Sequence, residues 1–528
     1  MTSISLFRIL WVAAACLIWL RLLQLQVLDG PYWKERGEQI RVWSEPLPAR
    51  RGRILDREGH PLADNQPWIG QQPMTPELQA RMAEKMEMNP NATGQAVRAQ
   101  RVYPEGAVCG HLTGYAGELH QGQGDWKGRE GLELALESRL RGKDGRRQWL
   151  VTAQGKRLRL LEEKLPIAGE DVSLTLHLEL QRRSYRYLSS VLGQLGAVRT
   201  RKDQPAGALV VVDPQSGEVL SLVSLPSYDP NFFVDPRRQK QLQRLLKDPD
   251  SPLLNRAIAG QYPAASTFKI VTASAALEEG LITAQRRFYC QGVRFVGETP
   301  FHCFVRRGHG DLSFEDSIAY SCDCVFYDLG LELGGKRLNL WAQRWGLGQL
   351  TGLELPGESE GFVPAGNLTL GEEANLSIGQ GSLLVTPAQM ARLVGGVATG
   401  GSLAPLSLLP SRSRLRPLRV NLQPNSWKRL KDGLEGAVSR GTAAGVAQKS
   451  GLRLAGKTGT VENSPSDSNP RGYNHTWFVT YGPLDSPRPL AIAVFLERSG
   501  GYGGALAAPI AAQIAADWRS LEEKSRRR

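Results

Sequence analysis

The chain has 528 residues, of which 41% are hydrophobic and 22% are charged, so a disordered or low-complexity protein is excluded. Its length predicts two or three folded units. The formal net charge is +13, but the basic residues are spread along the sequence without a basic stripe, so we expect no nucleic-acid partner. Six cysteines are too few for a disulfide scaffold in a chain of this length.

The N-terminus is apolar. Residues 9–20 carry no charge and are flanked by Arg8 and Arg21. With the apolar residues that follow, the segment is long enough to cross a bilayer once if both arginines reach the interfaces. No small residues follow it at a cleavage position, as a signal peptide would require. We therefore predict an uncleaved transmembrane anchor over residues 1–28, with the rest of the chain on one side of the membrane.

The next segment, residues 29–170, is polar, balanced in charge and interrupted by turns. A short strand is expected at Arg53–Leu55, followed by a turn at Arg57–Gly59. Residues 74–87 have the spacing of an amphipathic helix. We interpret residues 29–170 as a separate elongated domain of mixed structure.

The pattern changes near residue 171. The alternation of apolar residues predicts strands at 172–181, two hairpin strands within 208–226, and strands at 475–482 and 490–497. The helical spacing predicts helices at 262–283, 313–334 and 384–398, and a last helix from Pro509 to about Leu521. Strands at both ends and helices between them predict one α+β domain over residues 171–521, followed by a basic tail at 522–528.

Three short motifs in this domain carry chemistry. Ser266 and Lys269 form an S-x-x-K motif at a predicted helix start, where residues three apart share a face. Ser321 opens the tripeptide Ser-Cys-Asp, and Lys457 opens the tetrapeptide Lys-Thr-Gly-Thr. Each motif alone is weak, but an S-x-x-K, S-D-N and K-T-G set in this order is typical of penicillin-binding proteins and related β-lactamases.

The chain as a whole resembles the class B penicillin-binding proteins, which are D,D-transpeptidases of peptidoglycan synthesis. The resemblance covers almost the whole length. It rests on the segments RGRILDREGHPLADN, YPEGAVCGHLTGYAG, GREGLELALESRLRGKDG, VSLTLHLELQ, ALVVVDPQSGEVLSLVSLPSYDPN, YPAASTFK, GHGDLSFEDSIAYSCDCVFY, LSIGQGSLLVTPAQMA, AGKTGT, HTWFVTYGP and GGYGGALAAPI. It implies a membrane anchor, a pedestal domain, and a transpeptidase domain in which helices pack an antiparallel sheet beside an all-helical subdomain.

The resemblance also implies roles for the motif residues. Ser266 is expected to be the acylated nucleophile, Lys269 the base that activates it, Ser321 a proton relay and Lys457 an electrostatic tuner of the site. The expected substrate-binding residues are Asp323, Thr458, Gly459 and Thr460. The backbone N–H groups of Ser266 and Thr460 would form the oxyanion hole. One departure is Asp323, which stands where Asn is usual and which the elongation-type members share.

The segment Gly451–Thr458 also matches the phosphate-loop pattern G-x-x-x-x-G-K-[ST]. A phosphate loop needs a flexible turn before the Gly-Lys-Thr and a helix directly after it. Here the variable residues Leu452–Ala455 are strand-like, and the residues after Thr458 are rich in Gly, Asn, Ser and Pro. We therefore expect no nucleotide partner.

Four residues have spacing suited to a metal: Cys290, Cys303, His309 and Cys322. A Cys3His set is typical of structural zinc. Elongation-type penicillin-binding proteins resemble this chain in holding zinc at matching positions, although their first two ligands are carboxylates. A Cys290–Cys303 disulfide and free thiols are the alternatives. His302 is the competing imidazole, and the remaining cysteines Cys16, Cys109 and Cys324 are expected to be packed or membrane thiols.

These observations favour a peptidoglycan D,D-transpeptidase of the elongation type. The expected partners are the D-Ala-D-Ala donor stem peptide, an amine acceptor stem, β-lactams and a polytopic RodA-type glycan polymerase. The expected location is the bacterial cytoplasmic membrane, with the catalytic domain outside the cytoplasm. Two alternatives stay open: a β-lactamase or penicillin sensor, and a non-catalytic scaffold of the wall-synthesis complex.

Overall fold

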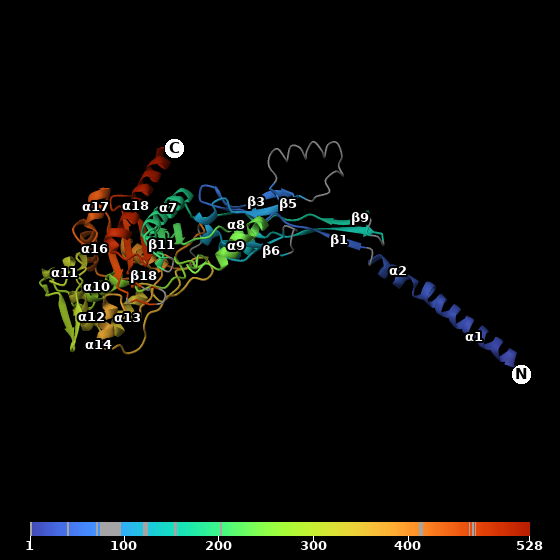
Figure 1. Cartoon of the computed structure of the whole chain (residues 1–528), viewed down its shortest axis with the longest axis horizontal. Coiled ribbons are helices and arrows are strands. Elements are labelled where there is room, and N and C mark those ends of the chain that lie inside the picture. Colours follow the sequence, from blue (N-terminus) through green and yellow to red (C-terminus); the bar gives the residue numbers. More distant parts are fainter. Residues whose placement is uncertain are drawn as a thin grey trace. The chain divides into compact units, whose positions relative to one another are not determined.

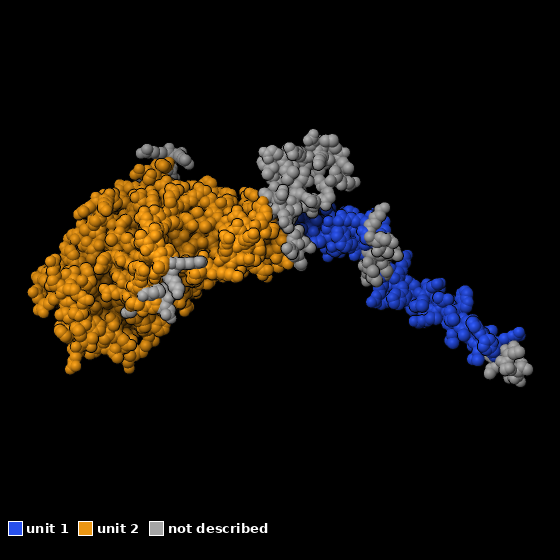
Figure 2. Space-filling view, in the orientation of Figure 1, with its two compact units in different colours: residues 1–52, 120–125, 138–170 blue, residues 53–119, 126–137, 171–528 orange. Residues whose placement is uncertain are grey.

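The computed structural model describes residues 3–39, 42–69, 72–73, 97–119, 125–152, 155, 157–200, 203–410, 416–463, 465–466, 469 and 471–527. Contacts divide the chain into two compact units, which Figure 2 colours separately. The first comprises Met1–Gly52, His120–Asp125 and Ser138–Glu170, and the second comprises Arg53–Leu119, Trp126–Glu137 and Asp171–Arg528. Both units contain helices and strands (Figure 1), which confirms the predicted α+β class.

The first unit begins with helix α1 (Ser3–Leu23), which continues as a π-helical turn to Leu28, and α2 (Gly30–Gln39) follows. Within the described residues, Phe7–Leu28 is the one helical stretch long and apolar enough to cross a membrane, and none of its most apolar window is buried. Apolar side chains that find no protein core are what a lipid-facing segment requires. The predicted anchor is therefore a helix of suitable length.

A three-stranded antiparallel sheet forms the rest of the first unit. Its order is β1-β8-β9, with bounds Val42–Leu47, Gly145–Val151 and Arg157–Lys164. Opposite charges face each other between β8 and β9, with Arg146–Glu162 at 2.8 Å and Arg147–Glu163 at 2.6 Å. Both pairs are exposed, so each adds little stability and mainly favours this register.

The second unit contains a five-stranded sheet close to its start in the sequence. The order is β10-β2-β3-β4, and β5 also pairs with β3. The strands are β2 (Ile54–Leu55), β3 (Pro61–Ile69), β4 (Gln72–Pro73), β5 (Val97–Val102) and β10 (Val172–Ser173). The short elements that follow β5 are α4 (Gly110–Thr113), β6 (Ala116–Glu118), β7 (Trp126–Gly128), α5 (Gly131–Ala135) and α6 (Glu137–Leu140).

The main sheet of the second unit has the order β12-β11-β21-β20-β19, and every neighbouring pair is antiparallel. The strands are β11 (Ala206–Val212), β12 (Val219–Leu225), β19 (Ala455–Val461), β20 (His475–Gly482) and β21 (Leu490–Glu497). Nearly all their residues are buried, because α7 (Leu178–Gly196) and α18 (Gly503–Arg527), both labelled in Figure 1, and α15 (Pro387–Ala398) pack against them. Helices on both faces explain the continuous apolar runs of β11 and β21.

The core of this unit lies between the sheet and the helices α7 and α18. Leucines of α7, apolar residues of the strands and the alanine- and isoleucine-rich face of α18 form one cluster. Representative members are Leu180, Leu188, Leu209, Val211, Phe478, Ile492, Val494, Ile510, Ile514 and Trp518. This core fixes the sheet whose free edge is β19, the strand that carries Lys457.

Helices and short hairpins fill the sequence between β12 and β19. The helices are α8 (Asn231–Val234), α9 (Gln239–Leu246), α10 (Lys269–Glu278), α11 (Phe314–Ala319), α12 (Asp323–Leu333), α13 (Gly335–Arg344), α14 (Leu370–Ser377), α16 (Pro424–Ser439) and α17 (Ala444–Ser450). The strands are β13 (Phe288–Cys290), β14 (Val293–Val296), β15 (Thr299–His302), β16 (Gly310–Leu312), β17 (Ser402–Leu403) and β18 (Leu418–Arg419). Turns of 3₁₀ helix lie at Gly106–Val108, Pro236–Arg238 and Ala265–Phe268.

The strand predictions for the main sheet are confirmed. The hairpin expected within 208–226 is β11–β12, and the strands expected at 475–482 and 490–497 are β20 and β21. Two other strand predictions are wrong. The strand expected at 172–181 ends at Ser173, and Leu452–Leu454 lie outside β19. In both places the apolar residues are buried by other elements rather than by strand pairing. The alternation of apolar residues does not distinguish a paired strand from an unpaired segment that is buried in this way.

The helix predictions need correction at breaks and ends. The helix expected at 313–334 is interrupted between α11 and α12 at Ser321, whose φ of 56° no helix accommodates. The last helix starts at Gly503, contains Pro509 within its first two turns, and runs to Arg527 rather than ending near Leu521. The helix expected at 74–87 lies outside the described residues.

Candidate active site

Ser266 lies in a 3₁₀ turn, Ala265–Phe268, that leads directly into α10. The preceding residue, Ala265, is fully buried and has a φ of 49°, a left-handed conformation that costs a non-glycine residue energy. The N–H of Ala265 donates to the carbonyl of Gly379 at 2.8 Å. A Cβ atom on Gly379 would lie 2.3 Å from the Ala265 carbonyl oxygen. The turn that presents Ser266, which is half-buried, is therefore held by a close backbone contact from a distant segment.

Lys269 is the first residue of α10 and is fully buried. Its Nζ donates to Asp323 Oδ1 at 2.7 Å, to the Ser321 carbonyl at 2.8 Å and to Ser321 Oγ at 3.2 Å. An ammonium group has three protons, so these bonds use all of them. Among the described residues, Ser266 Oγ makes no hydrogen bond to Lys269. The one-turn spacing places Ser266 and Lys269 together at the start of α10. The carboxylate of Asp323, however, is a stronger hydrogen-bond acceptor for the Lys269 amine than the Ser266 hydroxyl is.

Ser321 connects the two buried lysines. It lies in the break between α11 and α12 and is only 5% exposed. Its Oγ accepts from Lys269 Nζ at 3.2 Å and from Lys457 Nζ at 2.7 Å. The left-handed backbone at Ser321 ends one helix and starts the next, and this break is what turns the hydroxyl toward both amines. The structure therefore brings Lys269, Ser321 and Lys457 into one hydrogen-bonded chain.

Lys457 is fully buried on the edge strand β19. Besides Ser321 Oγ, its Nζ donates to the carbonyl of Thr458 at 3.2 Å, and among the described residues it pairs with no carboxylate. Burial lowers the pKa of Lys457 well below its ordinary value, the charge of Lys269 lowers it further, and Asp323 opposes both effects. A neutral amine is therefore accessible at Lys457, and a neutral amine can accept a proton.

Asp323 is the carboxylate of the site. Its Oδ1 accepts from Lys269, and its Oδ2 accepts from the backbone N–H of Phe304 at 3.0 Å. The side chain is 12% exposed, so its charge is stabilised mainly by these two donors. The substrate-binding role predicted for Asp323 stays a prediction, because both of its oxygens are occupied within the protein. Phe304 was missed from the sequence, since a backbone donor leaves no sequence signal.

The remaining predicted substrate residues follow Lys457 on β19. The strand pairs with β20 on one side only, so its other edge is free among the described residues. Gly459 allows close packing, because a Cβ atom there would lie 3.1 Å from Trp477 Cβ and 3.2 Å from Thr267 Cγ2. This contact places the free edge of β19 against the Ser266 turn. The Thr460 carbonyl accepts from Gln380 Nε2 at 3.4 Å.

Thr458 has a partner that the sequence did not reveal. Its Oγ1 lies 2.7 Å from Thr442 Oγ1, and Thr458 itself is 7% exposed. Thr442 lies in the turn after α16 and carries no motif, so no spacing rule points to it. Gln380, in contrast, belongs to the segment LSIGQG that supported the family resemblance, and that segment was the available signal for it.

The four predicted metal ligands lie together next to this site. One donor atom from each of Cys290, Cys303, His309 and Cys322 lies within 4.8 Å of all the others, and Cys303 Sγ is 3.5 Å from His309 Nδ1. Hydrogen bonds from the thiols of Cys322 and Cys324 hold the pKa of Cys303 far below its ordinary value, which favours a thiolate. The set of three sulfurs and one imidazole nitrogen fits a closed tetrahedral zinc site.

The geometry bears on two of the alternatives for these residues, the disulfide and the competing imidazole. All six cysteines are free, so the Cys290–Cys303 disulfide is not formed. His302 is exposed on β15 and lies outside the cluster, so His309 is the imidazole that belongs to it. Cys109 and Cys324 are buried, as expected for packed thiols, and Cys16 is exposed on the apolar helix α1.

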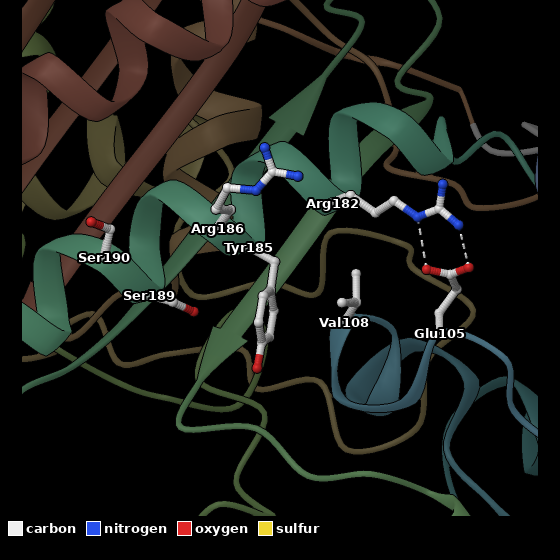
Figure 3. A pocket seen from close by; sticks show the side chains of 7 residues that line it. All are labelled: Glu105, Val108, Arg182, Tyr185, Arg186, Ser189 and Ser190. Carbon is white, nitrogen blue, oxygen red and sulfur yellow. Dashed lines mark hydrogen bonds and ion pairs between the residues drawn. The ribbon is translucent and has the colours of Figure 1, made fainter.

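A surface hollow of about 610 Å³ lies along α7 (Figure 3). Its lining residues are Glu105, Val108, Arg182, Tyr185, Arg186, Ser189 and Ser190. Arg182 holds Glu105 with two hydrogen bonds, of 2.9 and 2.6 Å, across the hollow's rim. The hollow shares no residue with the lysine–serine site, and two of its charged groups, Arg182 and Glu105, neutralise each other.

The segment that matched the phosphate-loop pattern has the wrong surroundings for a phosphate. Lys457 and Thr458 lie inside strand β19, which continues to Val461, and no helix begins after them. The Lys457 amine points to Ser321 rather than to an open loop of backbone N–H groups. The segment therefore matches the phosphate-loop pattern in sequence but not in structure.

Comparison with known proteins gives a consistent result. The profile of a family described as "Penicillin binding protein transpeptidase domain" matches residues 207–516, and that of "Penicillin-binding Protein dimerisation domain" matches residues 67–174. The "Peptidoglycan D,D-transpeptidase MrdA" of Acinetobacter baumannii is 28% identical over 575 residues, which cover 92% of this chain and 83% of that protein.

Two solved structures have similar folds over the whole length. A chain of a structure described as "Structural coordination of polymerization and crosslinking by a peptidoglycan synthase complex" has a TM-score of 0.77 and 32% identity, covering 98% of both chains. A chain of the complex between penicillin-binding protein PBP2 and MreC from Helicobacter pylori has a TM-score of 0.74 and 25% identity, covering 91% of this chain and 99% of that one. Since the transpeptidase profile covers more than half of its residues, this chain belongs to the penicillin-binding protein transpeptidase family.

Proposed function

We propose that the chain is a peptidoglycan D,D-transpeptidase of the elongation type, with Ser266 as its nucleophile. The observation that carries this proposal is the bonded chain Lys269–Ser321–Lys457, which ends beside Asp323 and next to the Ser266 turn. Two buried amines joined by a hydroxyl form a path along which a proton can move in either direction. The similarity to the D,D-transpeptidase of Acinetobacter baumannii supports the same reaction.

In the first step, Ser266 Oγ attacks the carbonyl carbon of the penultimate D-alanine of the donor stem. Lys269 first passes one proton through Ser321 Oγ to the neutral amine of Lys457. Lys269 then takes the Ser266 proton, and Asp323 stabilises the ammonium that results. The tetrahedral oxyanion is held by the backbone N–H groups of Ser266 and Thr460. As the peptide bond breaks, the leaving D-alanine nitrogen takes a proton delivered through Ser321 from Lys457. The product is an ester between the stem peptide and Ser266.

In the second step, the amine of a neighbouring stem attacks this ester. A new peptide bond forms, the bond to Ser266 Oγ breaks, and the amine's proton returns through the lysines to the serine oxygen. A β-lactamase would use water in place of the amine. The free edge of β19 supports a peptide-binding role, because an extended stem can pair with it by backbone hydrogen bonds.

The test is labelling of the purified full chain with a fluorescent penicillin, followed by mass mapping of the adduct and its release kinetics. We expect a long-lived adduct on Ser266 that is absent in Ser266→Ala. Rapid release would indicate a β-lactamase. No adduct in a folded sample would indicate a scaffold. An adduct on another residue would refute the assignment of Ser266.

The Cys–His cluster supports a finer proposal, one structural zinc ion held by Cys290, Cys303, His309 and Cys322. Bound there, the ion would brace the loop that carries Phe304 and the start of α12, because its ligands Cys303 and Cys322 are each next to a residue of the active site. Elemental analysis of the purified chain is expected to give one zinc per chain, and Cys303→Ser is expected to lose it. An unchanged zinc content in Cys303→Ser would contradict the proposed ligand set, and a metal-free wild type would contradict the site itself.

The apolar helix and the similar structures support proposals for the location and the partners. We propose that Phe7–Leu28 anchors the chain in the bacterial cytoplasmic membrane, with the catalytic domain outside the cytoplasm. The similar chain of a peptidoglycan synthase complex supports a RodA-type polymerase partner. Protease added to intact spheroplasts is expected to cleave the catalytic domain, and affinity purification of the full chain is expected to retain the polymerase. Protection of the domain from protease would reverse the orientation.

A further inference from the structure

A pair of threonine hydroxyls joins β19 to the turn that follows α16. Thr442 Oγ1 and Thr458 Oγ1 are 2.7 Å apart, a distance at which one hydroxyl must donate to the other. Thr458 directly follows Lys457 and is 7% exposed, whereas Thr442 is half-buried. The family resemblance makes Thr458 an expected substrate-binding residue, and it assigns no role to Thr442.

The backbone around Thr442 is fixed from two other directions. Its N–H donates to the carbonyl of Ala319, the last residue of α11, at 3.2 Å. The preceding Gly441 packs closely against the same carbonyl, because a Cβ atom on Gly441 would lie 2.1 Å from the Ala319 carbonyl oxygen. On the other side, a Cβ atom on Gly504 would lie 2.1 Å from the Thr442 carbonyl oxygen. Thr442 therefore has little freedom to move away from Thr458.

The number of protons in the pair limits what it can do. Each threonine hydroxyl has one proton to donate and two lone pairs to accept with. One of the two protons is used between the threonines, so one remains for a ligand. If Thr442 donates, the Thr458 proton is the free one, and the accepted bond turns it away from Thr442. The neighbouring Lys457 amine is already bonded to Ser321 and to the Thr458 carbonyl.

We propose that Thr442 is a positioning residue that donates to Thr458 and thereby directs the Thr458 hydroxyl proton to the terminal carboxylate of the donor stem or of a β-lactam. This inference rests on the proposed function. A pre-oriented hydroxyl needs no reorganisation when the carboxylate binds, and a hydroxyl that has already accepted one hydrogen bond is a better donor. The anion recognised is therefore the carboxylate next to the scissile amide, and Thr442 acts on it only through Thr458.

The test compares two probes on several variants of the full chain. The second-order rate of Ser266 acylation is measured with benzylpenicillin, which has the free carboxylate, and with its methyl ester, which lacks it. Thr442→Val removes the hydroxyl at nearly constant shape, and Thr442→Ser keeps it. Ser439→Ala, at an exposed position three residues earlier in the sequence, is the control for disturbance of the turn. Thr458→Val and the Thr442/Thr458 double valine variant complete a cycle.

We expect Thr442→Val to slow acylation by benzylpenicillin about tenfold and acylation by the ester by less than about twofold. Thr442→Ser should restore most of the rate, and the double variant should be no slower than Thr458→Val. Equal losses with both probes, no loss at all, or independent losses in the double variant would each overturn the inference. If Thr442→Val does not fold, Thr442→Ala is compared with Thr442→Ser in the same way. No Ser266 adduct in the wild type would instead refute the proposed function, and the inference with it.

Discussion

Lys269, at the start of α10, and Lys457, on β19, are both fully buried, but their hydrogen-bond partners differ. Lys269 has a carboxylate at 2.7 Å and a backbone carbonyl at 2.8 Å, so its charge is paired. Lys457 has a hydroxyl and a carbonyl as partners but no carboxylate in the part of the chain that the structure describes, and burial lowers its pKa. A buried lysine is thus paired with a carboxylate in one place, whereas in the other burial lowers the pKa of the amine. Residue type alone does not fix the role of a buried lysine; the nearest carboxylate does.

The largest effect is expected from Lys269→Gln, which removes the base while keeping a polar side chain. We expect Ser266 acylation by a fluorescent penicillin to slow by about 10²- to 10⁴-fold, the usual range for loss of general base catalysis. The matched control is Lys428→Gln, since Lys428 is exposed on α16. A loss smaller than tenfold would mean that Lys457, through Ser321, serves as the main base, and the comparison of the two lysines would be reversed.

The second test removes the carboxylate that distinguishes the two lysines. Asp323→Asn leaves a buried ammonium without its counter-charge, so we expect the free energy of unfolding of the catalytic domain to fall by about 3 kcal/mol. Urea unfolding followed by tryptophan fluorescence measures it. Asp311→Asn is the control, because its pair with Arg287 is exposed and should matter by less than about 0.5 kcal/mol. Equal effects in both variants would show that Lys269 does not depend on Asp323.

The third test uses the lowered pKa of Lys457. Between the folded pKa and the unfolded value of about 10.5, the unfolded state binds more protons at this residue than the folded state does. Its contribution to stability is therefore fully present above the unfolded pKa and is lost as the pH falls toward the folded pKa. In that window stability should rise with pH by at most about 1.4 kcal/mol per pH unit more in the wild type than in Lys457→Met. Urea unfolding of both proteins from pH 7 to pH 10 checks this slope. Parallel curves of unfolding free energy against pH would show that the pKa of Lys457 is not lowered.

The smallest effect is expected at Gln380, which reaches the carbonyl of Thr460 at 3.4 Å. This long bond at the end of the β19 motif is worth little, so Gln380→Ala should slow acylation by only about twofold. Gln380→Glu is a sharper variant, since a carboxylate cannot donate to a carbonyl and would repel the substrate carboxylate. If Gln380→Ala costs as much as Lys269→Gln, then Gln380 contacts the substrate directly instead of supporting the strand.

Local sequence was a good guide wherever a single element decides the structure. The strands β11, β12, β20 and β21 follow from their apolar runs and from the turn signals beside them. It was a poor guide where a distant element intervenes. The helix predicted through Ser321 breaks there, and Pro509 lies inside α18, beyond the first turn in which a missing N–H is tolerated.

The candidate site divides in the same way. The sequence by itself predicted which residues could react, because three motifs in order name Ser266, Lys269, Ser321 and Lys457, and this set is typical of acyl transfer through a serine. It also named the four cluster residues that the fold brings together.

Only the tertiary structure decided how these groups are bonded and charged. Asp323 accepts a hydrogen bond from Lys269, and the backbone N–H of Phe304 donates to Asp323. The hydroxyl of Thr442, in the turn after α16, is hydrogen-bonded to the hydroxyl of Thr458. These contacts join segments far apart in the sequence, and one of them uses a backbone donor that every residue but proline has. Burial is the main cause of the lowered pKa of Lys457, and burial is a property of the packed fold rather than of any short pattern.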